Sequence, residues 1–221
     1  EGPRVVYVSS RAGTVLQVSY HTRNLLCVLQ LHNGPILSLE VNEDHAITGS
    51  EDKVLRMWPL DFSDFLMEAA HESPVVSVCT SKDGLKLAVG TAAGSISVLD
   101  VMTHGYTTAL RSHRGGVTAA AIDPSEERDD FATVSEDCTI RVWDLVSGVQ
   151  RYQFSSPTDR PTCERWHLVA GYASGTVRVF DVPSTSTLLE LEQHRSAVQQ
   201  VSIAGGNRSF VCCMGFCRGL L

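Results

Sequence analysis

The sequence has few lysines and no long apolar run. Its only lysines are Lys53, Lys82 and Lys86, and 25 acidic residues outnumber 18 basic ones, for a net charge of -7. Phosphate backbones and acidic protein tails are attracted to basic surfaces, so this balance disfavours direct electrostatic capture of either. The apolar runs are also far shorter than the roughly 20 residues of a membrane-spanning helix. We therefore expect no nucleic acid and no membrane among the partners.

The seven cysteines lack the spacing of a metal site. Zinc sites typically contain closely paired cysteines and further Cys or His ligands, and no CxxC pair occurs here. Cys212, Cys213 and Cys217 cluster near the end of the chain without such a set. No signal peptide is recognisable, which favours a reducing compartment and free thiols. The sequence thus predicts a cytoplasmic protein with no metal and no cofactor.

A nine-residue segment occurs five times along the chain, in altered form. The copies read SRAGTVLQV, SEDKVLRMW, TAAGSISVL, SEDCTIRVW and YASGTVRVF, and they end at Val18, Trp58, Leu99, Trp143 and Phe180. The intervals between these last residues are 40, 41, 44 and 37. Apolar and polar residues alternate on either side of turn-forming residues, which is typical of two strands joined by a tight turn. Gly94 and Gly175 are expected to supply the turn conformation in copies that lack an Asp there.

Two further strand-like runs flank each copy, which makes four short strands per period. Between Gly34 and Arg111, such runs are separated by polar residues, Gly, Pro or Asp. A unit of this size cannot bury a face by itself, so neighbouring units must stack. Four strands every forty-odd residues predict the blades of a β-propeller.

From Arg4 to about Ile203 the chain resembles the WD40-repeat β-propeller family. Trp143 and Asp144 form the family's signature dipeptide, and a His precedes the first strand of four repeats, at His32, His71, His113 and His194. The resemblance implies an all-β fold, a WD40-type β-propeller segment of about four to five four-stranded antiparallel blades in an open arc of a larger propeller. The expected boundaries are a partial repeat over 4–31, repeats over 32–70, 71–112 and 113–155, a shortened repeat over 156–193, the start of a further repeat over 194–203, and an atypical, disordered tail over 204–221.

Two parts of the chain depart from the repeat pattern. Between Phe154 and Leu168, the residues SSPTDRPTCERWH leave little room for a first strand, so the fifth repeat is expected to be short. The chain starts with Glu1 in a repeat already past its first strand, and the last repeat stops soon after His194. We therefore expect part of a propeller, with incomplete first and last blades.

In the family that this chain resembles, a His, a strand Ser or Thr, a turn Asp and a Trp are hydrogen-bonded in a row within one blade. Two complete sets occur here: His32, Ser50, Asp52 and Trp58, and His113, Ser135, Asp137 and Trp143. Ser, His and Asp are also the members of a hydrolase triad. A triad occurs once and has no role for Trp, whereas this set occurs twice at the repeat spacing. We therefore interpret both sets as partners of buried polar groups and not as catalytic residues.

Three arginines share one column of the repeat, two residues before the Trp position. They are Arg56, Arg141 and Arg178. On neighbouring blades they would form a stripe that binds an acidic partner. Scattered, solvated strand residues are the alternative interpretation.

The segment from His32 to Ser63 and the following HESPVVSVCTSKDGLKL are similar to a group of large centriolar and ciliary WD-repeat proteins. This resemblance implies a non-enzymatic scaffold at the microtubule wall of centrioles, active in cilium assembly and located at the centrosome, centriole and ciliary basal body. Its partners would be centriolar and ciliary proteins, and microtubules through a separate domain. The alternative is an adaptor that reads a peptide or a modification, as in a ubiquitin ligase or chromatin assembly. We do not expect an enzyme, because no nucleophile and base occur outside the repeat pattern and no Gly-rich phosphate loop is present.

Overall fold

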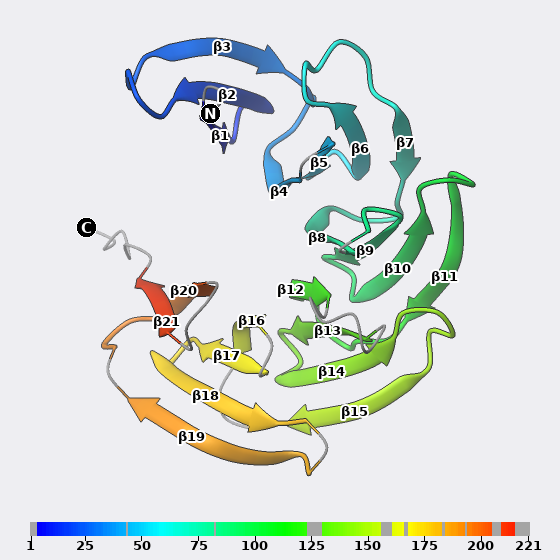
Figure 1. Ribbon diagram of the computed structural model, residues 1–221. Helices are drawn as coiled ribbons and strands as arrows, with labels where there is room; N and C mark the ends of the chain where they lie inside the picture. The colour runs from blue at the N-terminus through cyan, green and yellow to red at the C-terminus, as the bar shows by residue number, and fades with distance from the viewer. Residues whose placement is uncertain are drawn as a thin grey trace.

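The computed structural model describes residues 4–42, 44–81, 83–122, 130–155, 161–165, 168–182, 184–192, 194–204 and 209–214. These residues form strands, turns and bends, with no helix among them, so none of their segments is a helix able to cross a membrane. Six antiparallel sheets follow one another along an arc, which stays open between the first sheet and the last (Figure 1). The predicted all-β fold with an open arc of four-stranded sheets is confirmed.

Each sheet is built from consecutive strands. The first contains β1 (Val5–Ser9), β2 (Thr14–Ser19) and β3 (Leu25–Gln30). The second contains β4 (Ile36–Val41), β5 (His45–Ser50), β6 (Val54–Pro59) and β7 (Met67–Ala70). The third contains β8 (Val75–Thr80), β9 (Lys86–Thr91), β10 (Ser95–Asp100) and β11 (Gly105–Arg111). The fourth contains β12 (Val117–Ile122), β13 (Asp130–Ser135), β14 (Thr139–Asp144) and β15 (Gln150–Ser155). The fifth contains β16 (Pro161–Arg165), β17 (Val169–Tyr172), β18 (Thr176–Asp181) and β19 (Ser186–Glu192), and the sixth β20 (Val198–Ala204) and β21 (Ser209–Met214).

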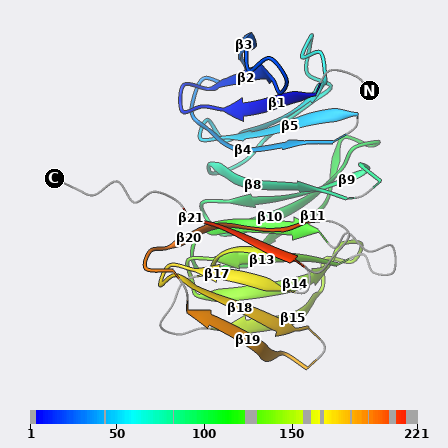
Figure 2. The same ribbon diagram turned by 60° about the vertical axis from the view of Figure 1, so that its left-hand side comes forward.

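The four-stranded sheets are the blades of a propeller. In each of them the first strand lies nearest the centre of the arc and the fourth at its outer rim (Figure 1), and the blades stack along the arc in the second view (Figure 2). Side chains of the innermost strands also join successive blades. The hydroxyl of Ser38 on β4 accepts a hydrogen bond from the amide of Val78 on β8 at 3.0 Å, and Ser77 on β8 accepts one from Ala120 on β12 at 2.8 Å. The two bonds join residues that are 40 and 43 positions apart, which is close to the length of one repeat.

The hydrophobic core lies between blades and not within them. Each cluster combines buried residues from neighbouring sheets, such as Val15 with Trp58, Met57 with Leu99, and Phe154 with Phe180. A single sheet is only one layer thick and has no interior of its own, so burial requires the next blade. This is the stacking that the repeat length predicts.

The five repeat turns adopt one backbone conformation. Their fourth residues all have positive φ, 79°, 70°, 84°, 65° and 93° at Gly13, Lys53, Gly94, Cys138 and Gly175. The glycines of the third and fifth repeats thus have the predicted turn role. In the second and fourth repeats a side-chain-bearing residue occupies the same left-handed region, and an Asp stands immediately before it.

Two expectations about irregular segments need correction. The fifth repeat does contain a first strand, because the five residues Pro161–Arg165 pair with β17 and complete a four-stranded sheet. A strand needs only enough residues to form its backbone ladder, and five residues reach roughly 17 Å. The expected disordered tail also differs, because Ser209–Met214 pairs with β20 over its whole length. Residues 205–208 and 215–221 of that tail lie outside the described part of the chain.

Candidate functional site

Two identical rows of hydrogen bonds cross the second and fourth blades. In the second blade, His32 Nδ1 lies 3.0 Å from a carboxylate oxygen of Asp52, and His32 Nε2 lies 2.7 Å from Thr48 Oγ1. Trp58 Nε1 donates to the same Thr48 oxygen at 2.9 Å. His32 and Thr48 are almost completely buried, so these bonds satisfy polar groups that water does not reach.

The fourth blade repeats this geometry. His113 lies 3.0 Å from Asp137 and 2.8 Å from Thr133 Oγ1, and Trp143 Nε1 donates to Thr133 at 2.9 Å. An indole N–H can only donate and an ionised carboxylate can only accept, so one proton arrangement satisfies every member. In it the Trp donates to Thr, the Thr hydroxyl to His Nε2, and His Nδ1–H to Asp. The row therefore holds a neutral imidazole.

The threonines of these rows were not predicted from the sequence. The prediction that Ser50 and Ser135 supply the hydroxyls of the rows is wrong, because Thr48 and Thr133 contact the imidazoles. The Ser50 hydroxyl donates to the Pro35 carbonyl at 2.9 Å and accepts from the Asp52 amide at 3.1 Å. Ser135 likewise donates to a carbonyl, that of Gly115, at 3.0 Å. Both serines tie the turn after the second strand to the segment that precedes the first strand.

Strand register explains why Thr and not Ser joins the row. In the second blade Trp58 pairs with Ala46, and Thr48 pairs with Arg56. Side chains alternate between faces, so Thr48 lies diagonally across from Trp58 on the same face, whereas Ser50 is two residues further away. The signal available in the sequence was a hydroxyl residue two positions before each Ser.

The two aspartates bond to the backbone of their own turns in addition to bonding to the histidines. Asp52 Oδ1 accepts a bond from the Val54 amide at 3.1 Å, and Asp137 Oδ1 one from the Thr139 amide at 3.0 Å. Burial disfavours the Asp137 carboxylate, but bonds from Thr139, the Arg114 amide and His113 outweigh it and lower the pKa of Asp137 to about 2. Burial also lowers the pKa of His113 below its ordinary value, against the opposing effect of Asp137. Both pKa shifts favour an ionised Asp137 that accepts the Nδ1–H bond of a neutral His113.

This geometry removes the resemblance to a hydrolase triad. A catalytic Ser would donate its proton to the imidazole, whereas the hydroxyls of Ser50 and Ser135 donate to backbone carbonyls. The imidazole nitrogens of His32 are bonded to Asp52 and Thr48, so neither nitrogen contacts a serine hydroxyl.

The arginine column is also engaged within the blades. Arg56 Nε donates to Glu68 at 2.8 Å and Arg178 Nε to Glu190 at 3.0 Å, which joins the third and fourth strands of each blade. Arg141 bonds the Ser112 carbonyl, next to the buried His113. The three side chains are only 17–21% exposed. These contacts favour a structural role over a stripe that binds an acidic partner.

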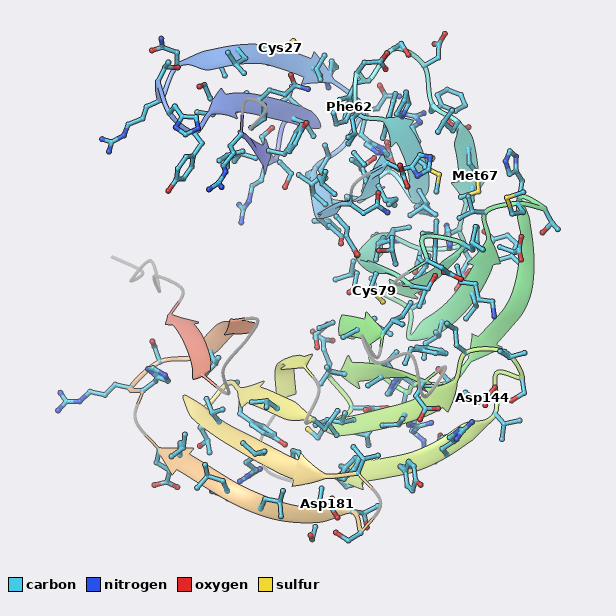
Figure 3. The ribbon with its side chains drawn as sticks, viewed as in Figure 1. Cys27, Phe62, Met67, Cys79, Asp144 and Asp181 are labelled. Atoms are coloured by element: carbon cyan, nitrogen blue, oxygen red, sulfur yellow. The ribbon has the colours of Figure 1, made fainter. Side chains whose placement is uncertain are left out.

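Cys27, Cys79 and Cys138 carry free thiols. Cys79 is buried on β8, the innermost strand of its blade (Figure 3). In the described part of the chain, no three His, Cys, Asp or Glu residues come together as a metal site. The side chains of Cys163, Cys212 and Cys213, and the whole of Cys217, lie outside the described residues.

Comparison with known proteins identifies the repeat. Residues 23–59 and 105–144 match the family described as WD domain, G-beta repeat. WD repeat-containing protein 90 of Xenopus tropicalis is 37% identical over 235 residues, covering 95% of this chain and 13% of that protein. The Homo sapiens protein of the same name is 38% identical, covering 88% and 12%. Centriole proteome protein 16 of Chlamydomonas reinhardtii is 46% identical over 211 residues, covering 93% and 10%. The chain thus spans between a tenth and an eighth of the length of these relatives.

Solved structures share the fold. A chain from the crystal structure of the mitotic checkpoint complex superposes with a TM-score of 0.86 at 16% identity, covering 95% of this chain and 68% of that one. The computationally designed Ika8 protein gives a TM-score of 0.80 at 21% identity, covering 96% and 65%. At such identities the likeness is one of fold alone.

Proposed function

This chain carries WD40 repeats, and on that premise we propose that it is a protein-interaction scaffold that does no chemistry. One observation carries the proposal: the Ser, His and Asp residues that would make a nucleophilic site are bonded to one another and to the backbone as supports of the blades. What the arc offers to other molecules is a rigid frame with exposed turns. Binding residues are commonly found on such turns, because a rigid scaffold holds them in place.

We further propose that the scaffold acts at centrioles and in cilium assembly. The proposal is supported by the similarity to WD repeat-containing protein 90 and to a protein named for the centriole proteome. Contact with microtubules would pass through another part of the whole protein, because the acidic surface charge of this chain repels acidic tubulin tails.

Proximity labelling with the full-length protein that carries this chain tests its location. Centriolar proteins and tubulin among the labelled neighbours are the expected result. Neighbours drawn from chromatin or from ubiquitin-ligase complexes would instead assign the chain to an adaptor of another pathway.

A fluorophosphonate probe tests the absence of chemistry. Ser50 and Ser135 should remain unlabelled, because their protons are committed to carbonyls. Labelling of either serine that disappears after heat denaturation would restore the hydrolase interpretation.

A further inference from the structure

A groove opens between the second and third blades. Its volume is about 450 Å³, and its apolar lining comes from both blades. Met57 is almost fully buried and belongs to the hydrophobic core between the two blades. The side chains of Leu66, Leu85 and Met102 are instead 46%, 43% and 75% exposed. Leu66 directly precedes Met67, which is labelled in Figure 3. Apolar side chains of this size, exposed together around a hollow, are typical of interaction sites on soluble proteins.

The backbone holds the groove open in its present shape. The Leu66 amide donates to the Met57 carbonyl at 2.7 Å, and the Val101 amide to the Leu85 carbonyl at 2.9 Å. These bonds anchor two rim residues to the strands behind them. A site that is already formed loses little conformational entropy when a ligand binds.

Carboxylates line and flank the groove. Asp44 and Asp83 line it, Asp61 lies in the turn that leads to Leu66, and Asp100 ends β10 directly before Val101 of the lining. Hydrogen bonds from Ser63, from Ser81 and from Thr103 lower the pKa values of Asp61, Asp83 and Asp100 respectively, so these carboxylates stay ionised at neutral pH. The positive charge of Lys86 also lowers the pKa values of Asp83 and Asp100, and it offsets part of the negative charge of these carboxylates. His45 and His104 complete the polar lining.

We propose that this groove binds a segment of a partner protein in which an aliphatic or aromatic side chain stands next to Lys or Arg. The apolar side chain would fill the hollow between Leu66, Leu85 and Met102, and the cationic neighbour would face Asp44 and Asp83. Acidic segments are disfavoured by the carboxylates. This proposal rests on the scaffold function and names the chemistry of one partner.

The direct test is selection of binders from a phage library of short random peptides. The chain is immobilised at low density, so that copies do not contact each other. Enriched peptides should combine an aliphatic or aromatic residue with adjacent Lys or Arg. A synthetic copy of an enriched peptide is then measured by fluorescence polarisation.

Variants assign the binding to the groove. The double variant Leu66→Ser with Met102→Ser should lower the affinity for the peptide by about tenfold or more. Asp44→Lys should lower this affinity by about threefold or more. Val146 and Val149 are 60% and 61% exposed beside the corresponding turn of the fourth blade, which makes Val146→Ser with Val149→Ser a matched control. The control should bind as the unchanged chain does. Equal thermal unfolding midpoints verify that all variants fold.

Several outcomes overturn the proposal: no enriched motif, a motif without cationic residues, or equal loss of binding in the control. Loss of self-association in the groove variant, without peptide binding, would assign the groove to a second copy of the chain. These results are independent of proximity labelling. Centriolar neighbours together with an empty groove would leave the proposed function standing and refute this site alone.

Discussion

Thr133 Oγ1 lies 2.8 Å from His113 Nε2, at the middle of the polar row that crosses the fourth blade. The hydroxyl donates to the imidazole and accepts from Trp143. It is fully buried, so no solvent replaces either bond if the hydroxyl is removed. The energetic importance of the row therefore depends on one threonine.

Thr133→Val keeps the shape of this side chain and removes its hydroxyl. We expect it to lower the free energy of unfolding by about 2 to 4 kcal/mol, because two buried groups lose their partner. Thr133→Ser is the matched control and should cost less than Val, since it keeps the hydroxyl. Chemical denaturation of both variants measures the difference, and equal costs would mean that the hydroxyl contributes nothing.

Asp137→Ala should destabilise the fourth blade more than Ser174→Ala destabilises the fifth. Asp137 accepts bonds from His113 and Arg114, which precede the first strand, and from Thr139 in its own turn, whereas the Ser174 hydroxyl is bonded to Thr176 within its own turn. The expected cost of Asp137→Ala is about 1 to 3 kcal/mol. Negligible shifts of the denaturation midpoint in both variants would refute the row.

The left-handed turn residues should respond oppositely to substitution. A Cβ at Gly94 would lie 2.6 Å from the carbonyl oxygens of His113 and Gly115, so Gly94→Ala should destabilise by well over about 1 kcal/mol. Lys53→Gly relieves a positive φ of 70° and should be neutral or stabilise by up to about 1 kcal/mol. Thermal unfolding of the two variants checks the signs. A stable Gly94→Ala variant would contradict the turn geometry.

Stability should fall as the pH falls from about 7.5 to about 5.5. Burial lowers the pKa of His32, His71 and His113 in the folded chain, although Asp52 and Asp137 oppose it at two of them. The unfolded chain therefore takes up protons below about pH 6.5 that the folded chain does not, and stability decreases with falling pH. Asp137 continues the loss from about pH 4 towards pH 2, since its folded pKa of about 2 lies below the unfolded value. Urea unfolding at a series of pH values measures the free energy of unfolding. A value that stays constant between about pH 7.5 and about pH 5.5 would contradict the prediction.

The isolated chain should self-associate. On the first sheet, Val6 pairs with Val18, and Leu16 pairs with both Val8 and Val28, so these side chains share one face. Val6, Val8 and Val28 are 43–54% exposed there, because none of the blades that the structure describes covers them. Bare apolar faces attract one another in water. Light scattering should detect association that Val8→Lys with Val28→Lys reduces, and a stable compact monomer at every concentration would contradict it.

Much of the architecture was predictable because its signals are local. The repeat interval, the alternation of apolar and polar residues, and turn residues such as Gly94 lie within short stretches of chain. They predicted strands, turns and stacked blades without reference to any distant contact. The roles of His113 and Asp137 were also predictable, since they recur at fixed offsets from Trp143.

The remaining features depend on which residues face each other after folding, and only the tertiary structure decided them. Register across β5 and β6 selects Thr48 over Ser50 as the partner of Trp58. The contact between Ser38 and Val78 joins residues 40 positions apart, and the groove combines Leu66 with Met102 from different blades. A sequence by itself determines the period of its side chains along a strand. The distances between strands and between blades decide which side chains meet.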